Sequence, residues 1–149
     1  MRSSLPILVL LYSFFFISSC NKDDVSKAVI LQSAEYTIYD ISNSGITGKA
    51  TFTQEDNGST HVLIELEGSF TSVNPAYIRF NTAAKGGDVA ITLKVCECAI
   101  SNTTITKFDN GSPITYEGLL NLNGHITIHD GSGSNAAIVA VADIGSNAN

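Results

Sequence analysis

Few residues in this 149-residue chain are able to carry chemistry: three cysteines and three histidines stand out. Cys96 and Cys98 flank Glu97, and two thiols beside a carboxylate are suitable ligands for a soft metal ion. In an extended segment their Cβ atoms lie about 7 Å apart, beyond the ~3.8 Å that a disulfide requires. A turn at this point permits a bridge, and an oxidising compartment favours one. Three outcomes stay open: a local disulfide, which we favour, two free thiols, or a metal site.

The histidines form no obvious ligand set. His125 and His129 share one face of a predicted strand, but four residues at ~3.4 Å each separate them by roughly 13–14 Å. Zinc–nitrogen bonds measure about 2.0–2.1 Å, so the two rings cannot share an ion on a straight strand. We interpret them and His61 as surface or boundary residues, and predict neither metal nor cofactor. The alternative is a copper or zinc site drawn from His61, His129, Asp143, Cys96 and Cys98.

Known catalytic patterns are absent from the sequence. It contains no Gly-x-Ser-x-Gly elbow, no phosphate-binding glycine loop with lysine, and no His-Glu-x-x-His. Glu65 and Glu67 share one face of a predicted strand, and we interpret both as solvated charges. We therefore predict that the protein is not an enzyme.

The N-terminus has the organisation of an export signal. Arg2 precedes thirteen uncharged residues, Leu5 to Ile17, which is the length of a signal-peptide core and shorter than the roughly 20 that span a bilayer. The following Ile17-Ser18-Ser19-Cys20 resembles the lipobox of bacterial lipoproteins, in which diacylglycerol is attached to the cysteine and the chain is cut just before it. We predict that residues 1–19 are a signal peptide and that Cys20 carries the lipid, with fatty acids such as palmitate.

The residues after Cys20 suggest where the protein is displayed. Lys22-Asp23-Asp24 resembles the lysine-plus-acid tag of Gram-negative lipoproteins that reach the cell surface. We expect an outer-membrane lipoprotein facing the surface, with residues 20–33 as tether and residues 34–149 as one domain. Without residues 1–19 the chain has seven basic and fourteen acidic residues, a formal charge of −7. This charge argues against nucleic acid as a partner.

Residue periodicity predicts an all-β domain. Val62, Ile64 and Leu66 alternate with polar neighbours, as in a half-buried strand, and Asp56–Ser59 (DNGS) before them is a strong hairpin signal. Ala136–Ile144 is a continuous apolar run, which we interpret as a strand buried on both faces. Pro113–Leu122 has the spacing of at most one short helical turn. We predict an antiparallel two-sheet β-sandwich of seven to nine strands.

Three segments, taken together, resemble a known family: Ala76–Leu93, Asn110–His129 and Ile138–Asn147. They resemble the chordin-type (CHRD) domain of bacterial lipoproteins, a β-sandwich related in fold to copper–zinc superoxide dismutase. The resemblance covers most of residues 35–147 and implies a Greek-key sandwich.

The resemblance fails at the metal ligands. Where the family often has a His-x-His pair, this chain has Tyr77-Ile78-Arg79, and a guanidinium is not a metal ligand at ordinary pH. His129 and Asp143 remain of the later polar positions of the pattern. We therefore reject dismutase activity for this chain.

The sequence favours a lipid-anchored, non-catalytic β-sandwich that acts as a surface binding or structural module. Its partners are the bilayer, through Cys20, and an unidentified protein or glycan. The rival interpretation is the copper or zinc protein described above. A third, a carbohydrate-binding sandwich, requires exposed aromatic side chains. Tyr36, Tyr39 and Tyr77 are available for this, but the sequence does not group them.

Overall fold

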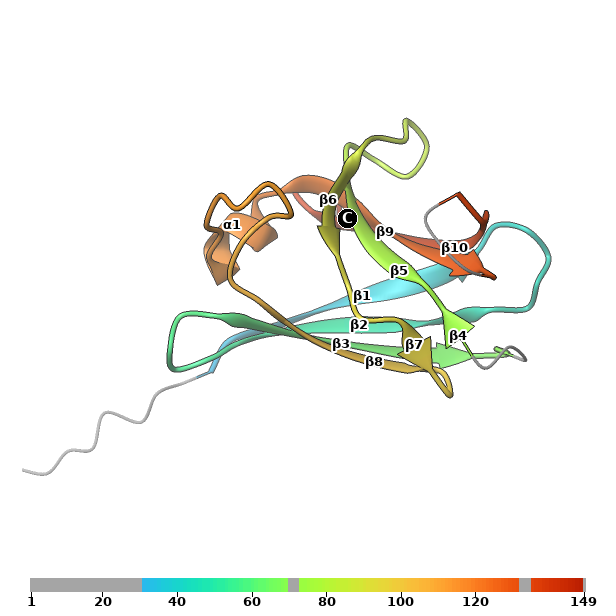
Figure 1. Cartoon of the computed structure of the whole chain (residues 1–149), viewed down its shortest axis with the longest axis horizontal. Helices are drawn as coiled ribbons and strands as arrows, with labels where there is room; N and C mark the ends of the chain where they lie inside the picture. The colour runs from blue at the N-terminus through green and yellow to red at the C-terminus, as the bar shows by residue number, and fades with distance from the viewer. Residues whose placement is uncertain (1–30, 70–72, 132–134, 149) are drawn as a thin grey trace, which may run out of the picture.

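The computed structural model describes residues 31–69, 73–131 and 135–148 (Figure 1). The predicted signal peptide, the Cys20 anchor and most of the predicted tether lie outside the described residues. In the described part of the chain, no helix has the length and apolar character needed to cross a bilayer.

The described residues form ten strands and one short helix, which confirms the predicted all-β class. All strand pairs are antiparallel, and their order in the sheet is β4-β7-β8-β3-β2-β1-β10-β9-β5-β6. The elements are β1 (Ser33–Asp40), β2 (Thr47–Gln54), β3 (Thr60–Glu67), β4 (Val73–Asn74), β5 (Ala76–Phe80), β6 (Val89–Thr92), β7 (Cys96–Glu97), β8 (Ile100–Ile105), α1 (Tyr116–Leu120), β9 (Asn123–Asp130) and β10 (Ala137–Gly145).

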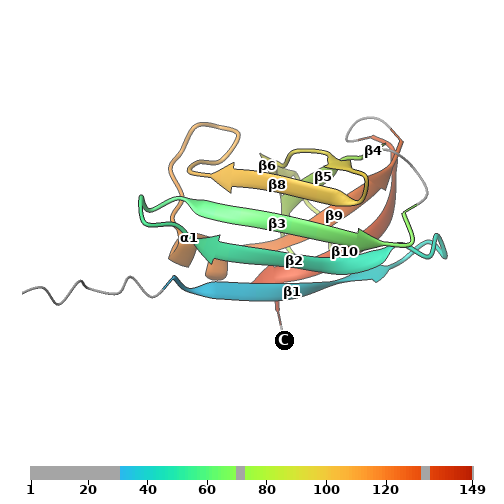
Figure 2. The ribbon, with the colours of Figure 1, turned by 90° about the horizontal axis from the view of Figure 1, so that it is seen from below.

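The ten strands belong to one continuous sheet, so the predicted pair of separate sheets with seven to nine strands is wrong. The physical reason is the length of β1, which pairs with β2 through Ser33–Ile38 and with β10 through Tyr39 and Asp40. The sheet curls at this strand, and its two halves face each other (Figure 2). The two-residue strands β4 and β7 account for part of the larger count.

The hydrophobic core lies between the two halves. One half contributes the fully buried side chains of Ile38, Phe52 and Ile64, and the other contributes those of Ile78 and Ile126. Alternation along each strand directs these side chains inward. The predicted inward face of β3 is confirmed, because Val62, Ile64 and Leu66 are all buried.

Strand β10 differs from its prediction. Its buried residues Ala140, Ala142 and Ile144 alternate with the half-buried Val141 and Asp143, so only one of its faces is in the core.

The hairpin and the helical turn that the sequence predicts are both present. Gly58 of the DNGS turn has a φ of +84°, and the Glu55 amide donates to the Ser59 carbonyl at 2.9 Å, closing the predicted hairpin between β2 and β3. The predicted helical turn is α1, where Thr115 Oγ1 accepts the Gly118 amide at 3.1 Å as an N-cap.

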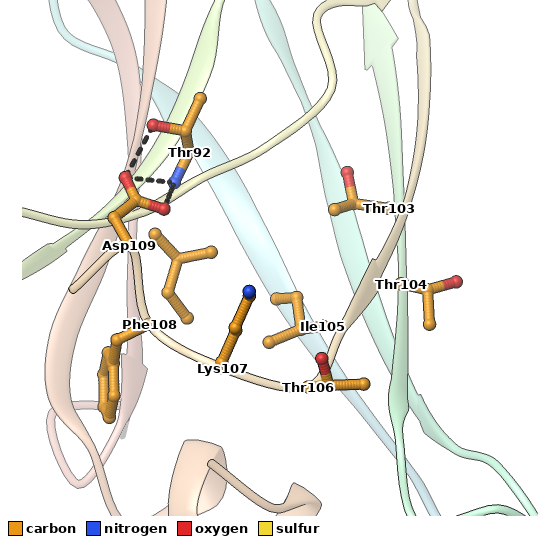
Figure 3. A pocket seen from close by; sticks show the side chains of 9 residues that line it. Thr92, Thr103, Thr104, Ile105, Thr106, Lys107, Phe108 and Asp109 are labelled. Carbon is orange, nitrogen blue, oxygen red and sulfur yellow. Dashed lines mark hydrogen bonds between the residues drawn. The ribbon is translucent and has the colours of Figure 1, made fainter. Parts of the chain in front are cut away.

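Side chains close the seam where β6 approaches β8. The Asp109 carboxylate accepts the Thr92 amide at 3.0 Å and the Thr92 hydroxyl at 2.7 Å (Figure 3). Thr103 Oγ1 accepts the Lys94 amide at 2.9 Å, and Ser101 Oγ donates to the Lys94 carbonyl at 2.6 Å. Hydroxyl and carboxylate groups therefore satisfy backbone groups that no neighbouring strand reaches.

Two buried threonines should respond oppositely to replacement by valine. Thr60 Oγ1 is buried and has no hydrogen-bond partner within the described chain, so Thr60→Val should raise the free energy of unfolding by about 1 kcal/mol. Thr103→Val leaves the Lys94 amide without its acceptor and should lower that free energy by about 1–2 kcal/mol. Urea unfolding of the two matched variants measures both effects. Equal shifts of the same sign would contradict this account.

Candidate functional site

The outer surface of β5, β9 and β10 carries a group of polar side chains. Strand register brings them together, because Tyr77 lies opposite Thr127, and His125 lies opposite both Arg79 and Asp143. His129 continues the same face of β9 two residues beyond Thr127. We call this group the polar face: Tyr77, Arg79, His125, Thr127, His129 and Asp143.

Loops cover the polar face. His125 and His129 are only 2% and 1% exposed, so their interpretation as surface or boundary residues is wrong. His125 Nδ1 lies 2.8 Å from the Asn81 carbonyl, and His129 Nδ1 lies 2.8 Å from the Ala136 carbonyl. The loop after β5 is also tied to β10, because the Ala83 amide donates to Asp143 Oδ1 at 2.7 Å.

Two glycines let the β5–β6 loop fold back over the strands. Gly86 has a φ of +68°, a conformation that other residues rarely adopt. A Cβ at Gly87 would collide with the Phe80 carbonyl oxygen, so only glycine fits the close approach there. The loop places the Gly87 carbonyl 3.2 Å from an Arg79 Nη, which donates to it.

A directed chain of hydrogen bonds crosses the centre of the polar face. A carbonyl oxygen only accepts, so His129 Nδ1 carries the proton that is donated to Ala136. Nε2 of the neutral ring then accepts from the Thr127 hydroxyl, 3.1 Å away. Thr127 Oγ1 in turn accepts from Arg79 Nε at 3.3 Å. Donation therefore runs from Arg79 through Thr127 to His129 and ends at the backbone.

The surroundings of His129 in this series of hydrogen bonds keep its ring neutral. Burial lowers the pKa of His129 from its ordinary value, and the nearby Arg79 guanidinium lowers it further, while the hydrogen bond to Ala136 opposes the shift. The Tyr77 ring packs edge-on against His129 with centroids 5.2 Å apart, and the Arg79 guanidinium carbon lies 5.7 Å from the Tyr77 centroid. Tyr77 thus contacts both the imidazole and the cation.

The candidate metal ligands are not brought together. His61 is on β3, in the other half of the sheet, and His129 lies four residues along β9 from the position opposite Asp143. Among residues 31–69, 73–131 and 135–148, no three His, Cys, Asp or Glu side chains converge. His129 Nε2, the atom that would bind an ion, already accepts from Thr127 beside a permanent cation. The polar face therefore does not fit copper or zinc.

The two downstream cysteines are free thiols, so the favoured disulfide is not formed in the structure. Cys96 is fully buried in the core, and burial raises the pKa of its thiol to about 12. Cys98 is exposed at the turn between β7 and β8, with a φ of +48°. One thiol points into the core and the other lies on the surface, which also separates them as metal ligands.

No protein-family model matches the chain, and no curated protein matches it significantly. The resemblance to the chordin-type domain therefore stays a prediction.

The sequence interpretation missed the role of Thr127. The segment His125–His129 reads His-Ile-Thr-Ile-His, and period-two alternation places all three polar residues on one face. That signal was available. The pairing of Thr127 with Arg79, which comes from β5, required the register of the strands.

The lowered pKa of His129 predicts a loss of stability in mild acid. The unfolded chain takes up a proton as pH falls through about 6.5, while the folded chain resists protonation, so folding weakens below that pH. In His129→Gln, the free energy of unfolding should fall less between pH 7 and pH 5 than in the wild type. Urea titrations across this range measure the difference. A wild-type pH dependence in His129→Gln would contradict the assignment.

Proposed function

We propose that this protein is an exported lipoprotein, held to a bilayer through acylated Cys20, whose all-β body is a non-catalytic binding or structural module at the cell surface. The lipobox-like segment before Cys20 and the Lys22–Asp24 tag support the location. Strand β1 begins at Ser33, so the residues from 20 to 32 would reach at most about 45 Å when extended. That reach allows the body to stand clear of lipid headgroups.

One observation carries the non-catalytic part of the proposal: the chain of hydrogen bonds from Arg79 through Thr127 to His129. In this arrangement Thr127 and His129 have their hydrogen-bond partners inside the protein, and the fixed positive charge of Arg79 lies beside them. An arginine in this position cannot coordinate a metal, and it opposes protonation of the neighbouring imidazole. The polar face therefore serves to hold the loops over the sheet.

We also propose that the curled sheet is related to the Greek-key sandwich of the chordin-type family. Support comes from its non-consecutive neighbours, since β3 pairs with β8 and β5 pairs with β9. In each case the chain between the two paired strands passes through the other half of the sheet before it returns, as in a Greek key. The polar face also includes Tyr77 and Arg79, the positions at which the resemblance places the family's His-x-His pair.

The alternative, a copper or zinc protein, has weaker support because its donors lie apart. It is tested by loading the purified full-length chain with copper(II) or zinc(II), dialysing it and measuring bound metal. We expect far less than one ion per chain. One equivalent of metal that is lost in His129→Ala, or in the double variant Cys96→Ser and Cys98→Ser, would overturn the non-metal proposal.

Lipidation is tested in cells that make the full-length chain with an alkyne-labelled palmitate analogue. The wild type should incorporate the label, and Cys20→Ala should lose it because the acceptor thiol is gone. Cys98→Ser removes an exposed thiol elsewhere and is the matched control, which should remain labelled. Protease treatment of intact cells should then release fragments of the body. Label retained in Cys20→Ala, or a body protected from protease, would contradict the anchoring or the surface display, respectively.

A further inference from the structure

Two adjoining hollows lie on either side of β1, and one of them borders the polar face. One, of about 300 Å³, lies toward β10 and includes Glu35 and Asp143 in its lining. The other, of about 400 Å³, lies toward β2 and β3 and includes Lys49 and Glu65. Thr37 and Tyr39 of β1 line both hollows. We call the combined surface the trough: Glu35, Thr37, Tyr39, Lys49, Glu65 and Asp143.

Tyr39 gives the trough an exposed aromatic ring. Its side chain is 61% exposed, whereas Tyr36 is only 8% exposed and packs edge-on against Phe52 in the core. Tyr77 is half-buried and contacts His129 and Arg79 on the polar face. Of the three tyrosines considered for glycan binding, Tyr39 is therefore the one that offers its ring to a ligand, with a hollow on each side.

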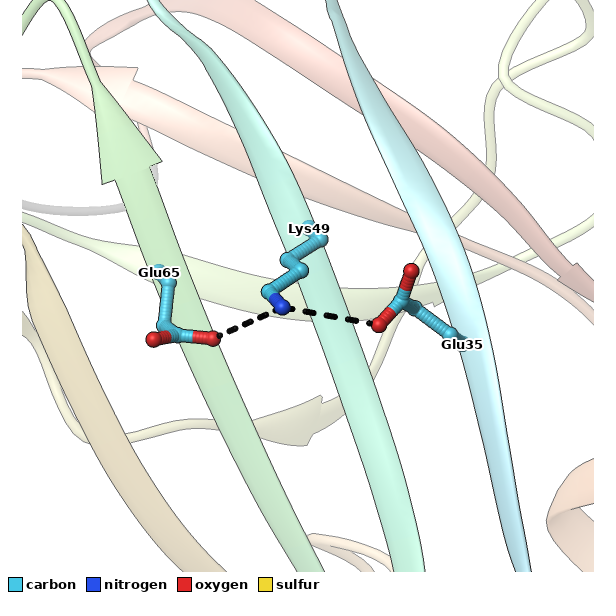
Figure 4. Close-up of polar contacts among 3 residues, drawn as sticks. All are labelled: Glu35, Lys49 and Glu65. Carbon is cyan, nitrogen blue, oxygen red and sulfur yellow. Dashed lines mark ion pairs between the residues drawn. The ribbon is translucent and has the colours of Figure 1, made fainter.

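Charged groups line the same two hollows as the Tyr39 ring. Lys49 Nζ lies 3.6 Å from Glu35 Oε2 and 3.5 Å from Glu65 Oε2, so one cation joins carboxylates from the strands on either side (Figure 4). Exposed ion pairs of this kind contribute little to stability. Their effect here is positional, because they hold both carboxylates beside β2. Each carboxylate stays about half exposed and keeps lone pairs for further hydrogen bonds.

We propose that the trough binds a neutral glycan chain. The C–H face of a sugar ring matches the apolar surface of the Tyr39 ring. The hydroxyls at the edge of the sugar are donors that suit the carboxylates of Glu35 and Glu65, and acceptors that suit the Lys49 ammonium. Two hollows flanking one aromatic ring accommodate successive sugar units. The acidic charge of the chain disfavours an anionic polymer.

This inference rests on the proposed function only in taking the body to be a binding module. It is tested by native gel electrophoresis of the full-length chain in a sugar-free detergent. Separate gels contain laminarin, mannan, xylan or dextran as neutral glycans, and polygalacturonate or polylysine as charged comparisons. At least one neutral glycan should retard the wild type, and Tyr39→Ala should weaken that retardation about tenfold.

Two controls separate loss of the ring from loss of the fold. Tyr39→Phe keeps the ring surface and should retain most of the binding. Val95→Ala removes a partly exposed apolar side chain on the segment between β6 and β7, and should bind as the wild type does. Urea unfolding of Tyr39→Ala should match that of the wild type, because the side chain is exposed.

Three results would overturn the proposal: no retardation by any neutral glycan, undiminished binding in Tyr39→Ala, or binding of polygalacturonate or polylysine alone. The last result would assign the trough to an ionic partner. Each leaves the palmitate labelling of Cys20 and the protease release of the body unaffected, so failure of the glycan inference is distinguishable from failure of the proposed function.

Discussion

The pairing of β1 with two different neighbours sets the shape of the whole sheet. Its first six residues pair with β2 and its last two pair with β10, so the sheet must curl there. The curl encloses the core and leaves the polar face and the trough on the outside. Asp40 ends the strand, because its carboxylate accepts the amides of Ser42 at 2.9 Å and Gly45 at 2.7 Å. These hydrogen bonds lower the pKa of Asp40 and begin the turn toward β2.

Much of the local structure was predictable because it depends on neighbouring residues. Alternation at Val62, Ile64 and Leu66 identified β3, and the Asn-Gly pair at residues 57 and 58 identified its hairpin. The single sheet was not predictable in the same way. Only the register shows that Tyr39 lies opposite Val141, across a long separation in sequence. A two-residue strand such as β7 has too few positions to give any period.

The errors at the candidate site have the same origin. Sequence periodicity correctly placed His125 and His129 on the face away from the apolar residues, but it could not show that loops bury that face. The segments that cover the two histidines include Asn81 and Ala136, whose carbonyls are hydrogen-bonded to the rings. The sequence favours a disulfide because a turn at Cys96 and Cys98 permits a bridge and an oxidising compartment favours one. The positive φ of Cys98 turns the chain so that only Cys96 enters the core.

The sheet protects its open end with side chains. An exposed strand edge invites pairing with another chain, and proteins usually block it. Here Asp109 covers the Thr92 amide, and Thr103 and Ser101 satisfy the backbone of Lys94. Strand addition at this seam would have to displace those bonds, and the polar face is occupied by its own hydrogen bonds. The trough around Tyr39 differs from both, because the Tyr39 ring and the carboxylates of Glu35 and Glu65 remain open to solvent. For the binding module proposed above, side chains on the outer face are therefore better placed to contact a partner than a strand edge.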